Sequence, residues 1–320
     1  MRGTDDSLAA YLADLRTGTD AGLERVLAAL AAPPLIVDAM RYSVMAGGKR
    51  LRPCITLAAA EAVGARTGLG AADARARALP AAVAIEMIHS YSLIHDDLPA
   101  MDDDALRRGR PTLHVVSGDG LAILAGDGLL TEAFNVLASS PSPASLPGSA
   151  EAPAQLRLRA SAVLSSAAGA VGMVGGQAID LAAAGKVPGA AVDISDARAL
   201  EDMHARKTGA LIRASAVTGA ILTGGAAPMV TAIDDYAREL GLAFQIIDDV
   251  LDVEGSSASL GKTAGKDAAA GKPTYPARYG IAESRRLAAA CVARATAALD
   301  GEGIGGRLAE IAAWSLTRQA

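Results

Sequence analysis

The sequence predicts an all-α fold, and its composition is the first reason. Apolar residues make up 51% of the 320 residues but aromatic residues only 3%, so the apolar mass is mainly Ala, Leu, Val and Ile. Alanine has the highest intrinsic helix propensity, and small side chains allow helices to pack closely. The apolar residues also recur at helical spacing, whereas no stretch alternates strongly enough to predict a sheet.

Segments with this helical spacing are separated by glycine, proline or polar turns. The expected helices cover residues 7–30, 35–45, 54–63, 121–137, 156–173, 200–223, 233–253, 281–299 and 308–316. Residues 71–79 are expected to form a short exposed helix or turn. Pro80 is then expected to begin a long apolar helix that ends in an acidic motif.

The segment 139–153, SSPSPASLPGSAEAP, is the clearest linker of the chain because it is rich in serine and proline. Helical patterning of the same kind resumes after it. We therefore expect a flexible surface loop near residues 139–155 within a single domain of residues 1–320. Residues 185–195 are expected to form a second loop.

The formal net charge of −5 argues against a nucleic-acid partner. The N-terminus carries Asp5 and Asp6 rather than the basic-then-apolar layout of a signal peptide. Apolar runs such as residues 81–85 are too short to span a bilayer. Cys54 and Cys291 lie in apolar contexts without the spacing of a metal or disulfide motif. We expect a soluble, cytoplasmic protein with reduced cysteines and no stable membrane anchor.

An acidic motif with five carboxylates lies within residues 96–104, directly after an apolar run. Such a density of negative charge repels itself unless a cation bridges it. Oxygen ligands alone favour a hard cation, Mg2+ or Mn2+, which typically also binds substrate phosphates. In isolation the motif would suit a solvated acidic turn equally well. A second acidic motif elsewhere in the chain would favour the metal site over the solvated turn.

Residues 244–252, FQIIDDVLD, provide that second motif. Asp248 and Asp252 are four residues apart, so their carboxylates project from one helix face, roughly 6 Å apart along the axis. A like-charge pair at this spacing destabilises a helix, and a bridging divalent ion would compensate for it. Two acidic helices of this kind can face each other across a bundle.

Basic residues accompany both acidic motifs. The GGKRLRP sequence at residues 47–53 predicts a glycine-led turn in which backbone N–H groups, Lys49 and Arg52 cradle an anion. The alternative is a helix C-cap with two solvated cations. His89 precedes Asp96 by two helical turns and is either a residue of the same cleft or a hydrogen-bonded core histidine.

Two further polar segments fit the same picture. Lys207 and Thr208 interrupt an apolar helix, which suits a polar cleft, although a lysine that snorkels at the surface would also explain them. The glycine- and lysine-rich segment 255–271, with Lys262, predicts a flexible lid that brings ammonium groups to phosphate oxygens. Carboxylates, lysines and arginines around an apolar cleft suit a diphosphate substrate. Because nucleophiles and cofactor motifs are lacking, ionisation of a diphosphate ester is favoured, with metal ions neutralising the leaving group.

The chain resembles the short-chain trans-isoprenyl (polyprenyl) diphosphate synthases, most closely the bacterial farnesyl diphosphate synthases. The resemblance rests on five features, which are in chain order GGKRLRP, the first acidic motif, Lys-Thr-Gly, the second acidic motif and the lysine-rich segment. The resemblance runs from about Tyr42 to Tyr279. It implies a single large antiparallel helix bundle around a deep apolar cavity, usually as a homodimer. It also implies head-to-tail condensation of isopentenyl diphosphate with dimethylallyl or geranyl diphosphate by ionisation, condensation and elimination, in which the released pyrophosphate takes the proton.

The resemblance implies roles for individual residues. Three Mg2+ ions, or Mn2+ in their place, would be held by Asp96, Asp97, Asp102, Asp248, Asp249 and Asp252. The allylic diphosphate would be bound by Arg107, Lys207 and Lys262. The isopentenyl diphosphate would be bound by Lys49, Arg52, His89 and Arg108. The carbocation would be stabilised by oxygen dipoles of Thr208 and Gln245, and Lys207 is expected to be a catalytic residue together with them.

Product length in this family depends on the residues four and five positions before the first aspartate, here Ser92 and Tyr91. Five helical residues rise about 7.5 Å, which is comparable with one or two isoprene units. The bulky Tyr91 favours farnesyl diphosphate (C15). Geranylgeranyl diphosphate (C20) stays open if Tyr91 packs in the core instead.

Two other classes of protein fit the sequence less well. A terpene cyclase usually lacks the second acidic motif, which this chain has. A non-catalytic helical partner subunit would lose an acidic motif or the basic residues, but this chain keeps both motifs and the basic residues. The family often ends in Arg-x-Lys, whereas only Arg318 is basic at this C-terminus. Pro273 stands where serine or threonine is common.

Overall fold

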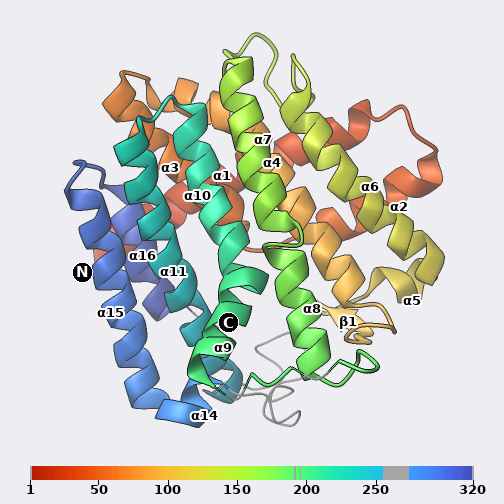
Figure 1. Ribbon diagram of the computed structural model, residues 1–320. Coiled ribbons are helices and arrows are strands. Elements are labelled where there is room, and N and C mark those ends of the chain that lie inside the picture. The colour runs from red at the N-terminus through yellow and green to blue at the C-terminus, as the bar shows by residue number, and fades with distance from the viewer. Residues whose placement is uncertain (1, 191, 195, 255–273, 319–320) are drawn as a thin grey trace. The chain divides into compact units, whose positions relative to one another are not determined.

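Helices account for nearly all of the regular structure in the computed structural model (Figure 1), which describes residues 2–190, 192–194, 196–254 and 274–318. Within those ranges the strands are limited to β1 (Leu106–Arg107) and β2 (Arg110–Pro111), which form a two-residue antiparallel ladder. The all-α prediction is therefore confirmed. The predicted lid with Lys262 lies outside the described residues.

The helices follow one another along the chain. From the N-terminus they are α1 (Arg2–Ala29), α2 (Pro34–Val44), α3 (Leu51–Thr67), α4 (Ala71–Asp96), α5 (Leu113–Ser117), α6 (Asp119–Ala138), α7 (Ala154–Ala168), α8 (Met173–Ala183) and α9 (Ala197–His204). They continue with the π-helical turn η1 (Ala205–Gly209), α10 (Ala210–Leu222), α11 (Ala227–Glu254), α14 (Tyr275–Tyr279), α15 (Ile281–Asp300) and α16 (Arg307–Thr317).

The chain forms two compact units. Unit 1 comprises residues 1–164 and 215–230, and unit 2 comprises residues 165–214 and 231–320. The helices α7, α10 and α11 each contribute residues to both units. The single domain expected for the whole chain stays a prediction.

The central helix of unit 1 is α4, which contacts α1, α2, α3 and α6. Residues 81–85 of α4 are completely buried, as expected for a helix that is apolar on all sides. The expected helix boundary at Pro80 is wrong, because α4 runs without a break from Ala71 to Asp96. A proline in a helix interior costs about 3 kcal/mol. Burial of Ala78 and the residues that follow Pro80 outweighs this cost.

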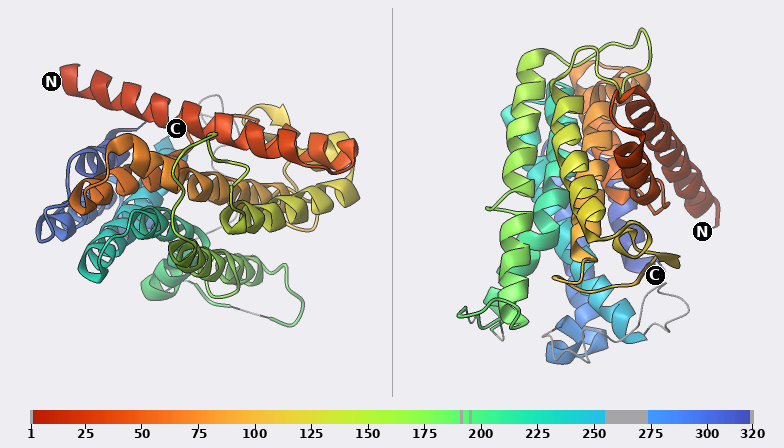
Figure 2. Two further views of the ribbon diagram at one scale, coloured as in Figure 1. Left: turned by 90° about the horizontal axis from the view of Figure 1, so that it is seen from above. Right: turned by 90° about the vertical axis from the view of Figure 1, so that its right-hand side faces the viewer.

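The helix α1 lies along α3 and α4 (Figure 2), and polar contacts tie the three together. The guanidinium of Arg75 on α4 pairs with Asp14 on α1 and with Glu61 on α3. The hydroxyl of Tyr11 also donates to Glu61, at 2.8 Å. These contacts join helices that are distant in the sequence but do not involve the predicted site residues.

The connection between α6 and α7 covers residues 139–153, where the sequence predicts a loop. The carboxylate of Glu151 accepts hydrogen bonds from Ser140 Oγ at 2.6 Å and from the backbone N–H of Ser142 at 2.6 Å. The guanidinium of Arg25 donates to the carbonyl oxygen of Ala144 at 2.8 Å. Residues 139–153 are thus non-helical, and the flexible surface loop near residues 139–155 stays a prediction.

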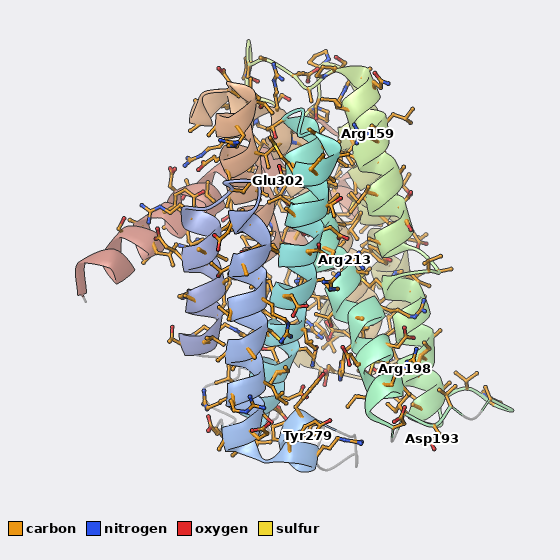
Figure 3. All side chains as sticks on the ribbon, turned by 60° about the vertical axis from the view of Figure 1, so that its left-hand side comes forward. Arg159, Asp193, Arg198, Arg213, Tyr279 and Glu302 are labelled. Atoms are coloured by element: carbon orange, nitrogen blue, oxygen red, sulfur yellow. The ribbon has the colours of Figure 1, made fainter. Side chains whose placement is uncertain are left out.

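In unit 2, the segments α9, η1 and α10 follow one another directly, and Figure 3 shows the run from Arg198 in α9 to Arg213 in α10. The predicted helix 200–223 is thus confirmed, with its polar interruption formed as a π turn. Another predicted helix, 156–173, is divided at residues 169–172 into α7 and α8. The helices α15 and α16 are in contact.

Two helical stretches in the described part of the chain, Asp119–Ala138 and Ala154–Ala183, are long and apolar enough to cross a membrane by length and composition alone. A core helix of a soluble protein meets the same criteria. The first stretch, α6, packs against α4, and its residues Ala125 and Leu129 are fully buried. The absence of a membrane anchor stays a prediction.

Candidate functional site

The first acidic motif lies where α4 ends. Asp96 is the last residue of α4 and Asp97 is its C-cap. Backbone N–H groups of Asp102 and Asp104 donate to the carbonyl oxygens of Asp96 and Asp97, at 2.9 and 3.2 Å. The turn therefore folds the motif back onto the helix end and brings the backbone of Asp102 to that of Asp96.

Arg107 on β1 forms a bidentate ion pair with Asp97. Its Nε lies 2.8 Å from Oδ1 and 2.9 Å from Oδ2 of Asp97, and its Nη2 lies 2.6 Å from Oδ1. Asp97 is buried, and burial raises its pKa above the usual range even though Arg107 opposes this effect. The pair fixes the start of the β1–β2 hairpin against the end of α4.

The basic turn at residues 47–53 packs against the same hairpin. The guanidinium of Arg108 donates to the carbonyl oxygen of Gly47. A Cβ added to Gly48, whose φ is +130°, would lie 2.7 Å from Arg108 Cζ, so only glycine lets Arg108 approach the turn this closely. Lys49 is exposed and Arg52 is half-buried at the start of α3.

His89 lies within the electrostatic reach of these cations. Burial, together with Arg52, Arg108 and Arg107, holds the pKa of His89 well below its usual value, so the imidazole is neutral at pH 7. Unit 1 thus brings together four of the residues predicted for diphosphate binding, next to the carboxylates of the acidic motif. A cluster of arginines of this kind suits an anion with several oxygens.

The two predicted chain-length residues lie in the last turns of α4. Tyr91 is buried, and its ring meets the ring of His95 edge to face with centroids 5.7 Å apart. Burial and the nearby Asp96 raise the pKa of Tyr91 to about 12. Ser92 is half-buried, and its hydroxyl donates to the carbonyl oxygen of His89 at 2.9 Å.

The remaining described site residues belong to unit 2. Lys207 and Thr208 lie in the π turn η1, and π turns inside α-helices often occur at functional sites. Lys207 Nζ lies 2.6 Å from Oδ2 of Asp180 on α8. A Cβ on Gly176 would lie only 2.3 Å from the backbone nitrogen of Lys207, which explains the glycine at this close approach of α8 and η1.

Asp180 is a residue of the site that the sequence reasoning missed. It follows the small residues Gly175 and Gly176 in the sequence. A signal existed, because Gln177 and Asp180 are polar, three residues apart, and surrounded by apolar residues of one helix. Asp180 is buried and forms an ion pair with Lys207.

The second acidic motif lies near the end of α11, and its residues have different environments. Asp248 is exposed and pairs with Arg318, whose guanidinium also stacks 4.3 Å from the centre of the Phe244 ring. Asp249 is buried, and its two oxygens accept hydrogen bonds from Gln245 Nε2 at 2.8 Å and from the backbone N–H of Tyr275 at 3.0 Å. Asp249 thereby joins the start of α14 to α11.

The donor chemistry of both motifs fits Mg2+. Within the ranges that the structure describes, no group of three or more His, Cys, Asp or Glu side chains converges on one point. This arrangement is compatible with Mg2+, which usually takes one or two carboxylates and completes its shell with water and substrate phosphates. The ligand roles of the six aspartates stay predictions.

Comparison with known proteins agrees with the resemblance seen in the sequence. A family model described as polyprenyl synthetase matches residues 33–300. The chain is 42% identical over 279 residues to the farnesyl diphosphate synthase of Geobacillus stearothermophilus, which covers 87% of this chain and 86% of that protein. It is 47% identical over 258 residues to the chloroplastic heterodimeric geranylgeranyl pyrophosphate synthase large subunit 1 of Arabidopsis thaliana. That match covers 80% of this chain and 64%, less than two thirds, of the plant protein.

A solved structure supports the same fold. The FPP/GFPP synthase from Zymomonas mobilis matches over 98% of both chains, with a TM-score of 0.77 and 34% sequence identity. The chain therefore has the all-α isoprenoid synthase fold. The relatives are named for different products: the Geobacillus stearothermophilus protein for farnesyl diphosphate and the Arabidopsis thaliana protein for geranylgeranyl pyrophosphate.

Proposed function

Because this chain belongs to the polyprenyl synthetase family, we propose that it is a trans-prenyltransferase that joins isopentenyl diphosphate to dimethylallyl or geranyl diphosphate. Its proposed main product is farnesyl diphosphate. The observation that carries this proposal is the cationic cluster of unit 1, in which Arg52, Arg107 and Arg108 act electrostatically on a buried, neutral His89, and Arg107 also binds Asp97 of the acidic motif. Such a cluster binds diphosphate oxygens, and the neighbouring carboxylates suit the metal ions that accompany a diphosphate.

The proposed roles of the residues follow from their chemistry. The carboxylates of Asp96, Asp97, Asp102, Asp248, Asp249 and Asp252 would hold Mg2+, with Mn2+ as a substitute. When bound, Mg2+ would neutralise the negative charge that develops on the diphosphate leaving group. Lys207, held by Asp180, would place its ammonium against the allylic diphosphate. Thr208 and Gln245 would direct oxygen dipoles at the carbocation.

The C15 product is proposed on the basis of Tyr91. The residue is large and buried within the last turns of α4, where a growing chain would be blocked early. Because some relatives are named as geranylgeranyl diphosphate synthases, the C20 product is the second candidate. Removal of the Tyr91 side chain distinguishes the two, as described in the Discussion.

A homodimer in the cytoplasm is also proposed. Four large apolar side chains are exposed on α5 and α6, namely Val115, Val116, Ile123 and Leu124. Clusters of exposed apolar side chains favour contact with another protein surface. Sedimentation equilibrium of the purified protein tests this assembly, and a monomer at micromolar concentration would exclude it.

The activity is tested by incubating the protein with isopentenyl diphosphate, Mg2+ and either dimethylallyl or geranyl diphosphate. The products are dephosphorylated and separated by chromatography. We expect farnesol as the main alcohol. Geranylgeraniol as the main alcohol would replace the C15 assignment by C20, and the absence of any prenyl alcohol would refute the enzymatic function.

A further inference from the structure

Arg50 differs from the other basic residues of the turn at residues 47–53 because its side chain is buried. Only 1% of the Arg50 side chain is exposed, whereas Lys49 is exposed and Arg52 is half-buried. A buried guanidinium is stable only if its charge and its N–H groups have partners. Arg50 is therefore not placed to bind a ligand that arrives from solvent.

Arg50 donates hydrogen bonds to three helices. Its Nε lies 2.8 Å from Oδ1 of Asp20 on α1, and its Nη1 lies 2.7 Å from Oε1 of Glu86 on α4. Its Nη2 lies 2.6 Å from the carbonyl oxygen of Val44, the last residue of α2. Because Arg50 is itself the N-cap of α3, one guanidinium joins four helices at this turn.

The backbone of Arg50 also has an unusual conformation. Its φ is +48°, in the left-handed region that residues other than glycine rarely adopt. Such a conformation costs of order 1–3 kcal/mol and persists only when surrounding contacts maintain it. The three hydrogen bonds of Arg50 are contacts of this kind: those to Glu86 and Val44 are buried, and the one to Asp20 is partly buried.

Glu86 connects this anchor to the cationic cluster. Only 3% of its side chain is exposed, and it precedes His89 by one turn of α4. Burial lowers the pKa of Arg50, but Glu86 and Asp20 more than reverse this effect, so the guanidinium stays charged. Arg50 and Glu86 therefore form a buried ion pair, which lies one helical turn of α4 from His89, a residue predicted to bind a diphosphate.

We propose that Arg50 is a positioning residue, whose three hydrogen bonds hold the 47–53 turn in the conformation that presents Lys49 and Arg52 to the diphosphate of isopentenyl diphosphate. The inference rests on the proposed function, because it concerns one of the two substrates. Arg50 does not touch that substrate. Its loss should therefore weaken the binding of one substrate selectively.

The test is Arg50→Lys, which keeps the positive charge. A single ammonium lacks the planar fork that reaches three acceptors in fixed directions. We expect the KM for isopentenyl diphosphate to rise about tenfold and the KM for geranyl diphosphate to change less than about twofold. A second variant, Glu86→Gln, removes the charge of the partner with little change of shape and should produce the same split between the two KM values.

The matched control is Arg75→Lys. Arg75 also joins three helices of unit 1, because it extends from α4 to Asp14 on α1 and Glu61 on α3. These partners belong to neither the basic turn nor the hairpin. We expect a lower melting temperature for this control and no split between the KM values.

The outcomes separate the inference from the proposed function. An equal fold-change of the two KM values, or no change in either, in folded Arg50→Lys and Glu86→Gln would overturn the inference. The same split in Arg75→Lys would also overturn it. Failure of both variants to fold, while Arg75→Lys folds, would show a purely structural pair and would also overturn it. If the unmodified protein forms no prenyl alcohol, the proposed function itself fails.

Discussion

The substitution Asp180→Asn tests whether Asp180 positions Lys207. The two side chains form an ion pair with Oδ2 and Nζ 2.6 Å apart, between the contacting segments α8 and η1. Asparagine has nearly the shape of aspartate but no charge. The substitution therefore removes the ion pair and leaves the packing around Gly176 almost unchanged.

The magnitude follows from the burial of the pair. The side chain of Asp180 is 8% exposed and that of Lys207 is 26% exposed, so water screens the lysine in part. Hydrogen bonds to charged groups contribute about 1.5–3 kcal/mol, and exposed ion pairs at most about 1 kcal/mol. We expect the free energy of unfolding to fall by about 1–2 kcal/mol, between these two ranges. Because the Lys207 ammonium loses its fixed position, kcat/KM for the allylic substrate should fall about tenfold to a hundredfold.

Stability is measured by urea unfolding, followed through the fluorescence of Trp314, the single tryptophan of the chain. Asp202→Asn is the matched control, since Asp202 forms an exposed pair with Arg206, the residue before Lys207. The control should lose less than about 0.5 kcal/mol and keep its kinetics. Unchanged kcat/KM in Asp180→Asn, with or without a loss of stability, would refute the positioning role.

Three further predictions concern other parts of the two units. Tyr91→Ala should lengthen the main product beyond C15, as chromatography of the prenyl alcohols would show, and an unchanged product would exclude Tyr91 as the limit. Asp96→Ala should lower kcat by about two orders of magnitude or more, because a proposed metal ligand is lost, while helical circular dichroism is kept. Loss of the helical signal would instead mark the acidic motif as structural. Gly176→Ala should destabilise the protein by about 1–3 kcal/mol, because its Cβ would overlap the Lys207 backbone. An unfolding midpoint in urea equal to that of the unmodified protein would contradict the close approach of α8 and η1.

Local patterns were sufficient for the helical class and for most helix positions. The predicted helix 233–253 corresponds to α11, Ala227–Glu254, and the predicted basic turn leads into α3 as expected. The spacing of Asp248 and Asp252 on one helix face is a local property as well. These features depend on residues within a few positions of each other, which the sequence displays directly.

Helix boundaries depended on packing that the sequence does not display. Pro80 is a helix breaker by local rules, but the burial of α4 on all sides carries the helix through it. The polar interruption of the predicted helix 200–223 became a π turn because α8 packs closely against it at Gly176. In both places tertiary contacts outweigh local preference.

The sequence by itself determined which residues are candidates for the chemistry. The two acidic motifs, the basic turn and the Lys207–Thr208 pair are recognisable from residue type and spacing. Only the tertiary structure decided which charged groups pair with them. Arg50 and Glu86 are 36 residues apart, and Asp180 and Lys207 are 27 apart. Burial makes such pairs strong, because charges removed from water interact through a medium of low polarity. Burial and proximity arise when helices pack, and no local pattern specifies which distant helices will do so.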